Sequence, residues 1–149
     1  MHFFFVVFAV LFSDQLVKFL VVKNMAEGQS IPVIPEIFHL TFVKNYGAAF
    51  GIMAYKTSFF VAIGIVVVLI ILFFYRRLGH EQKLLRLGLA LQLGGAIGNL
   101  IDRLRTGYVV DLFDFRIWPV FNLADTAIVI GVALLCWEIL RMPEGKRNP

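Results

Sequence analysis

The fold is decided by the stretch Ser58–Tyr75, SFFVAIGIVVVLIILFFY, which contains no charged residue. A transmembrane α-helix needs about 20 mostly apolar residues to cross the hydrocarbon core of a bilayer. Three other stretches meet this condition, at about 3–22, 84–101 and 119–140. The sequence therefore predicts an all-α membrane protein with four transmembrane helices, of which 58–75 is the only uncharged one.

The composition agrees with a membrane protein and excludes an ordinary soluble one. Of the 149 residues, 60% are hydrophobic and 16% are charged, compared with about 45–50% and about 25% in soluble domains. This length corresponds to one domain, so we expect 1–149 to form a single integral-membrane unit. The only cysteine, Cys136, lies in an apolar run. We expect it to pack in the interior, and we expect no metal site.

The positive charges indicate how the chain crosses the membrane. The net charge of +4 does not point to nucleic acid, because the basic residues form short clusters between apolar stretches instead of one polar face. Cytoplasmic loops carry an excess of Lys and Arg. The second loop and the tail contain Arg76, Arg77, Lys83, Arg86, Arg141, Lys146 and Arg147. The first and third loops are more thinly charged, so we expect them outside and both termini in the cytoplasm.

The first loop, at about 23–57, is too long for a simple connection between two helices. Within it, Ile37–Val43 partly alternates, with Phe38, Leu40 and Phe42 on one face. Such alternation is typical of a half-buried β-strand. We therefore expect a small β-containing domain in this outer loop.

Ionisable residues inside membrane spans are costly, so each is a candidate for function. In the first span, Asp14 and Lys18 lie on one helix face. In the third span, Asn99 and Asp102 share a face, with Arg103 adjoining. In the fourth span, Asn122 and Asp125 share a face. Asp125 lies roughly 9 Å inside Pro119 at the rise of an α-helix. Three helices thus bring polar groups into the outer half of the membrane, which predicts a site there.

Two carboxyl groups placed close together do not both ionise easily, so one holds a proton while the other accepts one from water. Asp125 is one candidate for such an aspartic-protease pair. A chain reversal through Trp118 and Pro119 would bring either Asp111 or Asp114 to it. The spacing leaves these two nearly tied, with Asp111 slightly ahead.

Two other classes of membrane protein are alternatives to a peptidase. A proton-coupled exporter would place a lone carboxylate near the midplane of a repeated architecture, whereas here the acids gather toward one interface and no repeat is visible. A non-catalytic assembly subunit would need neither a second aspartate in a loop nor a large outer loop. Both are less consistent with the sequence than a peptidase.

Five ordered motifs resemble those of the lipoprotein signal peptidases, or signal peptidase II, along nearly the whole chain. They are DQLVK at Asp14–Lys18, VKNYGAAFG at Val43–Gly51, GGAIGNLIDR at Gly94–Arg103, GYVVD at Gly107–Asp111 and FNLAD at Phe121–Asp125. The resemblance implies that Asp111 and Asp125 are the catalytic pair. It further implies that the site is lined by Asn45, Asn99, Arg103 and Asn122, while Asp14, Lys18 and Asp102 hold helices and loop in place.

The same resemblance implies the reaction. It is hydrolysis of the peptide bond before a diacylglyceryl-modified cysteine in a prolipoprotein, in the bacterial cytoplasmic (inner) membrane. A water between the two aspartates would be the nucleophile, so no cofactor, metal or covalent intermediate is needed. We expect the enzyme to be monomeric, to contact membrane lipid, and to hold its active site near the outer face.

Overall fold

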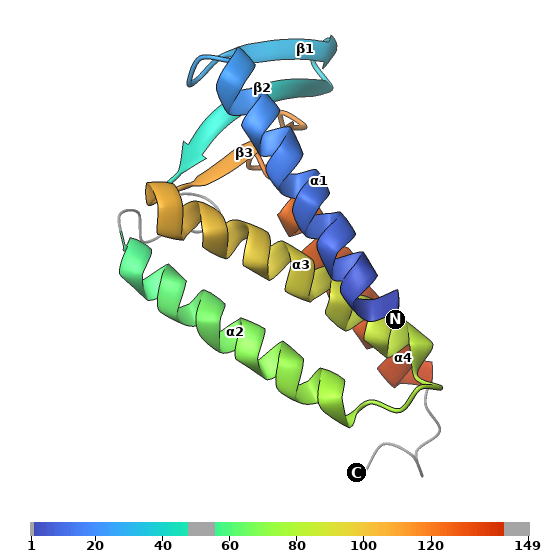
Figure 1. Cartoon of the computed structure of the whole chain (residues 1–149). Helices are drawn as coiled ribbons and strands as arrows, with labels where there is room; N and C mark the ends of the chain where they lie inside the picture. The colour runs from blue at the N-terminus through green and yellow to red at the C-terminus, as the bar shows by residue number, and fades with distance from the viewer. Residues whose placement is uncertain (1, 48–55, 142–149) are drawn as a thin grey trace.

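The computed structural model describes residues 2–47 and 56–141. Four helices, α1 (His2–Asn24), α2 (Thr57–Arg77), α3 (Lys83–Thr106) and α4 (Leu123–Arg141), form a bundle. Three strands, β1 (Ser30–Ile34), β2 (Phe38–Asn45) and β3 (Val109–Asp114), form a sheet at one end of it (Figure 1). The four predicted long apolar helices and the small β-containing domain are confirmed.

All four described helices are long and apolar enough to cross a membrane. Two of the predicted ends were wrong. The third helix continues to Thr106 and stops at Gly107, whose φ of 82° gives the left-handed C-cap that favours glycine. The fourth helix begins at Leu123, not at Pro119, because Phe121 forms a β-bridge with Phe113. Asp125 therefore lies in the first turn of α4, and its expected depth below Pro119 was wrong.

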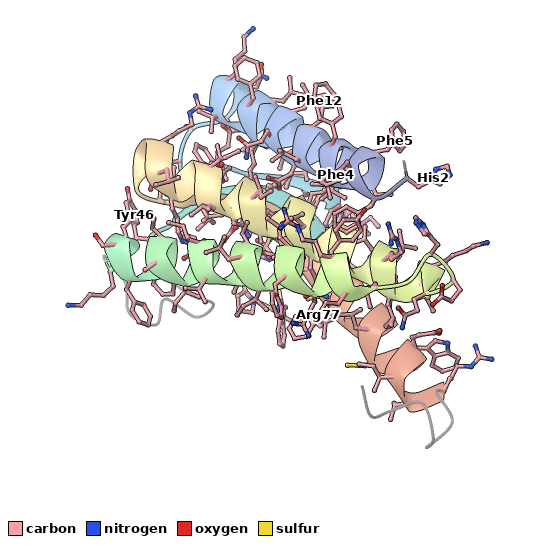
Figure 2. All side chains as sticks on the ribbon, turned by 60° about the horizontal axis from the view of Figure 1, so that its bottom comes forward. His2, Phe4, Phe5, Phe12, Tyr46 and Arg77 are labelled. Atoms are coloured by element: carbon pink, nitrogen blue, oxygen red, sulfur yellow. The ribbon has the colours of Figure 1, made fainter. Side chains whose placement is uncertain are left out.

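Helix α3 is the centre of the bundle and contacts each of the other three helices. It lies between α1 and α2 in both views (Figures 1 and 2). Glycines allow the close approach: a Cβ on Gly94 would lie 2.9 Å from the carbonyl oxygen of Val7 in α1. A Cβ on Gly95 would collide with the carbonyl oxygen of Ala124 in α4. Gly94 and Gly98 therefore lie at the contact of α3 with α1.

The sheet is antiparallel in the order β1-β2-β3. The predicted strand is present as β2, while β1 and β3 were not predicted. β1 contains Pro32, which removes a backbone donor and is tolerated at a sheet edge. β3 was interpreted only as part of a loop between two spans. It pairs with β2 through Val43 opposite Asp111, and Val110 and Leu112 pack on Phe42 and on Val21 of α1.

The outward surfaces of the helices are apolar, as lipid-facing surfaces must be. Figure 2 shows Phe5 and Phe12 on the side of α1 remote from α3, with exposures of 71% and 56%. Only Ile71 of α2 is buried. Cys136 is exposed on α4, so the expectation that it packs inside was wrong. An apolar run inside a membrane span fits a lipid-facing side as well as an interior one.

Candidate active site

Asp111 is buried in β3 because of the alternation of the strand. Its neighbours Val110 and Leu112 point toward the core, so the Asp111 side chain points to the opposite face. There its carboxyl group accepts two hydrogen bonds from amides. Asn45 Nδ2 donates to Oδ2 at 2.9 Å, and Asn122 Nδ2 donates to Oδ1 at 2.7 Å.

Asp125 occupies the third position of α4, and Asn122 caps that helix. Asn122 Oδ1 accepts the Asp125 N–H at 2.9 Å, and Asp125 Oδ2 accepts the Asn122 N–H at 3.4 Å. This reciprocal pair is a capping box. Asn99 Nδ2 of α3 donates to Asp125 Oδ1 at 2.7 Å. The i,i+3 relation noticed in the sequence thus arises from a helix N-terminus.

Asn122 contacts both aspartates and brings them to one cavity. The cavity has a volume of about 190 Å³, and both carboxyl groups line it. Burial and the negative charge of Asp125 raise the pKa of Asp111 to about 7, against hydrogen bonds from Asn45 and Asn122 and the charge of Lys18. Asp111 is therefore about half protonated near pH 7, whereas an ordinary aspartate is ionised there.

Asp114, the alternative partner for Asp125, lies three residues further along the same strand and hence on its other face. Burial alone would raise its pKa, but hydrogen bonds from the Arg116 backbone, Thr41 and the Arg116 side chain hold the pKa below its ordinary value. Thr41 Oγ1 donates at 2.8 Å, and Arg116 Nη1 forms an ion pair at 3.0 Å. Asp114 does not line the cavity described above.

A layer of charged groups supports the two aspartates from the side of α1. The predicted pair is present: Lys18 Nζ lies 2.9 Å from Asp14 Oδ2, and it lies 2.8 Å from Asp102 Oδ2. Lys18 also donates to Asn99 Oδ1 at 3.0 Å. Because that bond fixes the orientation of the Asn99 amide, the Nδ2 group is directed at Asp125.

The two carboxylates of this layer hold backbone as well. Asp14 Oδ1 accepts the Ala124 N–H at the start of α4, at 2.9 Å. Asp102 Oδ2 accepts the Val110 N–H in β3, at 3.2 Å. Gln15, which the sequence analysis did not select, donates to Asp102 Oδ1 at 2.9 Å. A polar amide inside an apolar span was the signal that would have identified it.

Arg103 extends from α3 toward the outer loop. Its Nη2 donates to the Gly47 carbonyl at 3.3 Å, and its guanidinium lies 5.1 Å from the ring centre of Phe60. Asn45 Oδ1 accepts the Gly47 N–H at 3.0 Å, so Asn45 is both a turn residue and a partner of Asp111. Residues 48–51 of the loop motif lie outside the described residues.

The cavity brings together the two aspartates and three of the four other predicted site residues, Asn45, Asn99 and Arg103. Asn122 is fully buried behind them. One wall consists of Trp118, Pro119, Val120 and Phe121. This wall was not predicted from the sequence, because hydropathy places Pro119–Phe121 in a membrane span. Within residues 2–47 and 56–141, no cluster of His, Cys, Asp and Glu is suited to a metal ion.

The Lys18→Met substitution tests the supporting layer. It leaves Asp14 and Asp102 buried without their cation and removes a bond to Asn99. We expect a loss of roughly 3–5 kcal/mol in the free energy of unfolding, measured by thermal denaturation in detergent. Lys44→Met is the control, because the Lys44–Glu27 pair is exposed to solvent and should matter little. Equal stabilities of the two variants would contradict this assignment.

Comparisons with known proteins agree with these features. The family model for signal peptidase (SPase) II matches residues 6–141. The lipoprotein signal peptidase of Moorella thermoacetica is 58% identical over 93% of this chain and 92% of its own length. That of Bacillus subtilis is 42% identical over 99% and 98%.

Solved structures are similar as well. A bacterial membrane enzyme determined by the in meso method at 2.3 Å resolution has a TM-score of 0.91 and 32% identity, covering 99% of this chain and 93% of that one. A second, determined at 1.9 Å, has a TM-score of 0.87 and 33% identity, with coverages of 95% and 94%. With a sequence matched over most of its length and two aspartates that line one cavity, the chain belongs to the signal peptidase II family.

Proposed function

We propose that this membrane aspartyl peptidase removes the signal peptide from prolipoproteins by cleaving before the diacylglyceryl-modified cysteine, with Asp111 and Asp125 as the catalytic pair. The observation that carries the assignment is the shared contact with Asn122, which holds the buried Asp111 carboxyl group and the half-buried Asp125 carboxyl group at one cavity. Membership of the family supports the substrate class.

In this mechanism a water molecule binds between the two carboxyl groups. Asp125 accepts a proton from the water as its oxygen attacks the scissile carbonyl carbon, and Asp111 donates a proton to the carbonyl oxygen. Collapse of the tetrahedral intermediate breaks the C–N bond, and the amine leaves with a proton from the dyad. The raised pKa of Asp111 supports its role as the acid.

We assign the surrounding polar residues by their contacts. Asn45 and Asn122 orient Asp111, and Asn99 orients Asp125. Arg103 lines the cavity. Only one of its donors has a partner among the described residues, Gly47 O. Its other donors are available for a backbone carbonyl of the substrate.

We further propose that both termini are cytoplasmic in the bacterial inner membrane. Arg76 and Arg77 end α2, Lys83 begins α3 and Arg141 ends α4, so these charges gather at the end of the bundle opposite the sheet (Figure 1). The dyad then lies near the outer face. There the acyl chains of a lipid-modified precursor would hold its cleavage site at the same depth. We also propose that the enzyme acts as a monomer.

The first test replaces each carboxyl group by its amide. Asp111→Asn and Asp125→Asn should each abolish processing of a lipid-modified precursor in membranes, because general acid–base catalysis contributes about 10²–10⁴-fold per group. Asp114→Asn is the matched control and should retain most activity, since Asp114 bonds Thr41 and Arg116 instead. Full activity in the Asp125→Asn protein would overturn the dyad.

The second test is the pH dependence of kcat/KM. The acid form of Asp111 is present below its pKa of about 7 and is lost above it. Cleavage should therefore slow as the pH rises through this value, approaching about tenfold per pH unit, with the profile reporting the dyad as a coupled pair. If the rate instead increases with pH over the same range, Asp111 is not the acid.

The third test concerns the lipid. If the acyl chains hold the scissile bond at the level of the dyad, a precursor without the diacylglyceryl group should be a poor substrate. Initial rates on lipidated and unlipidated forms of one precursor, in the same membranes, measure this directly. Equal rates would refute the role of the lipid in positioning.

A further inference from the structure

A second cavity lies at the end of the bundle remote from the dyad, where α1 and α3 begin. Its volume is about 260 Å³, larger than that of the catalytic cavity. The apolar part of its lining is formed by Phe3, Val6, Leu87 and Ala90. From Lys83 to Asn99, α3 runs for 16 residues, roughly 24 Å. The cavity is therefore separate from the peptidase site.

The polar part of the lining is basic. It consists of His2, His80, Lys83 and Arg86, and no acidic residue lines the cavity among the described residues. His2, His80 and Lys83 are exposed, and Figure 2 shows His2 at the end of the bundle where α2 ends. None of the four forms an ion pair within 2–47 and 56–141. The cavity thus combines an apolar lining with uncompensated positive charge.

One of the cations is held rigidly. Arg86 Nη1 donates to the Leu78 carbonyl at 3.1 Å, Nη2 donates to Tyr75 Oη at 2.9 Å, and the guanidinium lies 4.6 Å from the centre of the Tyr75 ring. Tyr75 in turn stacks on Phe3 at 3.7 Å between ring centres. A guanidinium has five N–H donors, and these bonds account for two of them. The remaining donors are held in place beside the cavity.

We propose that this cavity binds an anionic phospholipid. Its phosphate lies against Arg86, Lys83 and His80, and the start of its acyl region lies over Phe3 and Val6. Basic pockets between transmembrane helices are suited to anionic headgroups, and each nearby cation favours them by about fivefold in affinity. A soluble phosphate has no apolar part that could contact the apolar lining. Phe4 and Phe5, which follow the lining residue Phe3 in α1, are exposed, so apolar surface suited to lipid adjoins this part of the helix.

The site goes beyond the peptidase function and does not rest on it. The orientation proposed above adds only that the lipid comes from the cytoplasmic leaflet. Because the dyad lies at the other end of α3, cleavage of a lipidated precursor serves as an independent measure of correct folding. Failure of lipid binding with normal cleavage would contradict the lipid site alone.

The experiment measures lipid retained by the purified full chain in detergent, with phosphatidylglycerol or phosphatidylcholine added and the bound lipid counted by native mass spectrometry. We expect preferential retention of phosphatidylglycerol, reduced about fivefold by Lys83→Gln. Arg76→Gln removes the same charge at the same end of the bundle outside the cavity and should leave retention unchanged. Val6→Phe, which fills the cavity, should lower retention without altering any charge.

Several results would overturn the proposal. One is equal retention of the two lipids, and another is an equal loss in Lys83→Gln and Arg76→Gln, which would indicate general attraction to charge. A third is unchanged retention in Val6→Phe. In a parallel arm, glycerol phosphate at the same concentration should not displace the lipid; if it does, the site recognises a soluble anion instead.

Discussion

The structure depends on one buried ammonium group. Lys18 Nζ lies within 3.0 Å of Asp14, Asp102 and Asn99, inside a bundle whose outer surface is apolar. A lone charge in such a place is prohibitively costly, but two carboxylates and an amide oxygen use its three protons. Through these partners the cation joins α1 to α3, and Asp14 and Asp102 extend the connection to α4 and β3. Asp14 and Asp102 each accept a backbone N–H, those of Ala124 and Val110, so the network also fixes the path of the backbone.

The peptidase geometry follows from this arrangement. Asp14 and Asn122 together satisfy two backbone donors at the start of α4, and the same Asn122 amide reaches Asp111. Asn122 therefore caps the N-terminus of α4 and also binds the carboxyl group of Asp111. Glycines in α3 make the arrangement possible, because Gly95 allows α4 to approach until Ala124 is in contact with it. The close approach of the α3 and α4 backbones thus helps to bring both aspartates to one cavity.

Much of this was predictable from the sequence, and the reasons differ from one residue to another. Four spans followed from length and apolarity, and the Asp14–Lys18 pair from helical spacing. The choice between Asp111 and Asp114 did not follow, because it depends on strand alternation in a segment that was interpreted as a loop. Gln15 was missed because a neutral amide contributes no charge signal. The wall at Trp118–Phe121 was missed because helix boundaries are set by caps and bridges, here Asn122 and Phe121, and not by hydropathy.

The buried network also has a consequence for biogenesis. Lys18 comes from the first helix, Asn45 from the outer loop, Asn99 from the third helix and Asp125 from the fourth. Asp111 and Asp125 belong to the last third of the chain, and Asn122, which contacts both, is synthesised after Asp111. Until the fourth helix is inserted and capped, the two carboxyl groups have neither their shared partner, Asn122, nor a common cavity. With Asp111 and Asp125 as the proposed catalytic pair, such a hydrolase would remain inert throughout its own synthesis and would become proteolytic only with the completed bundle.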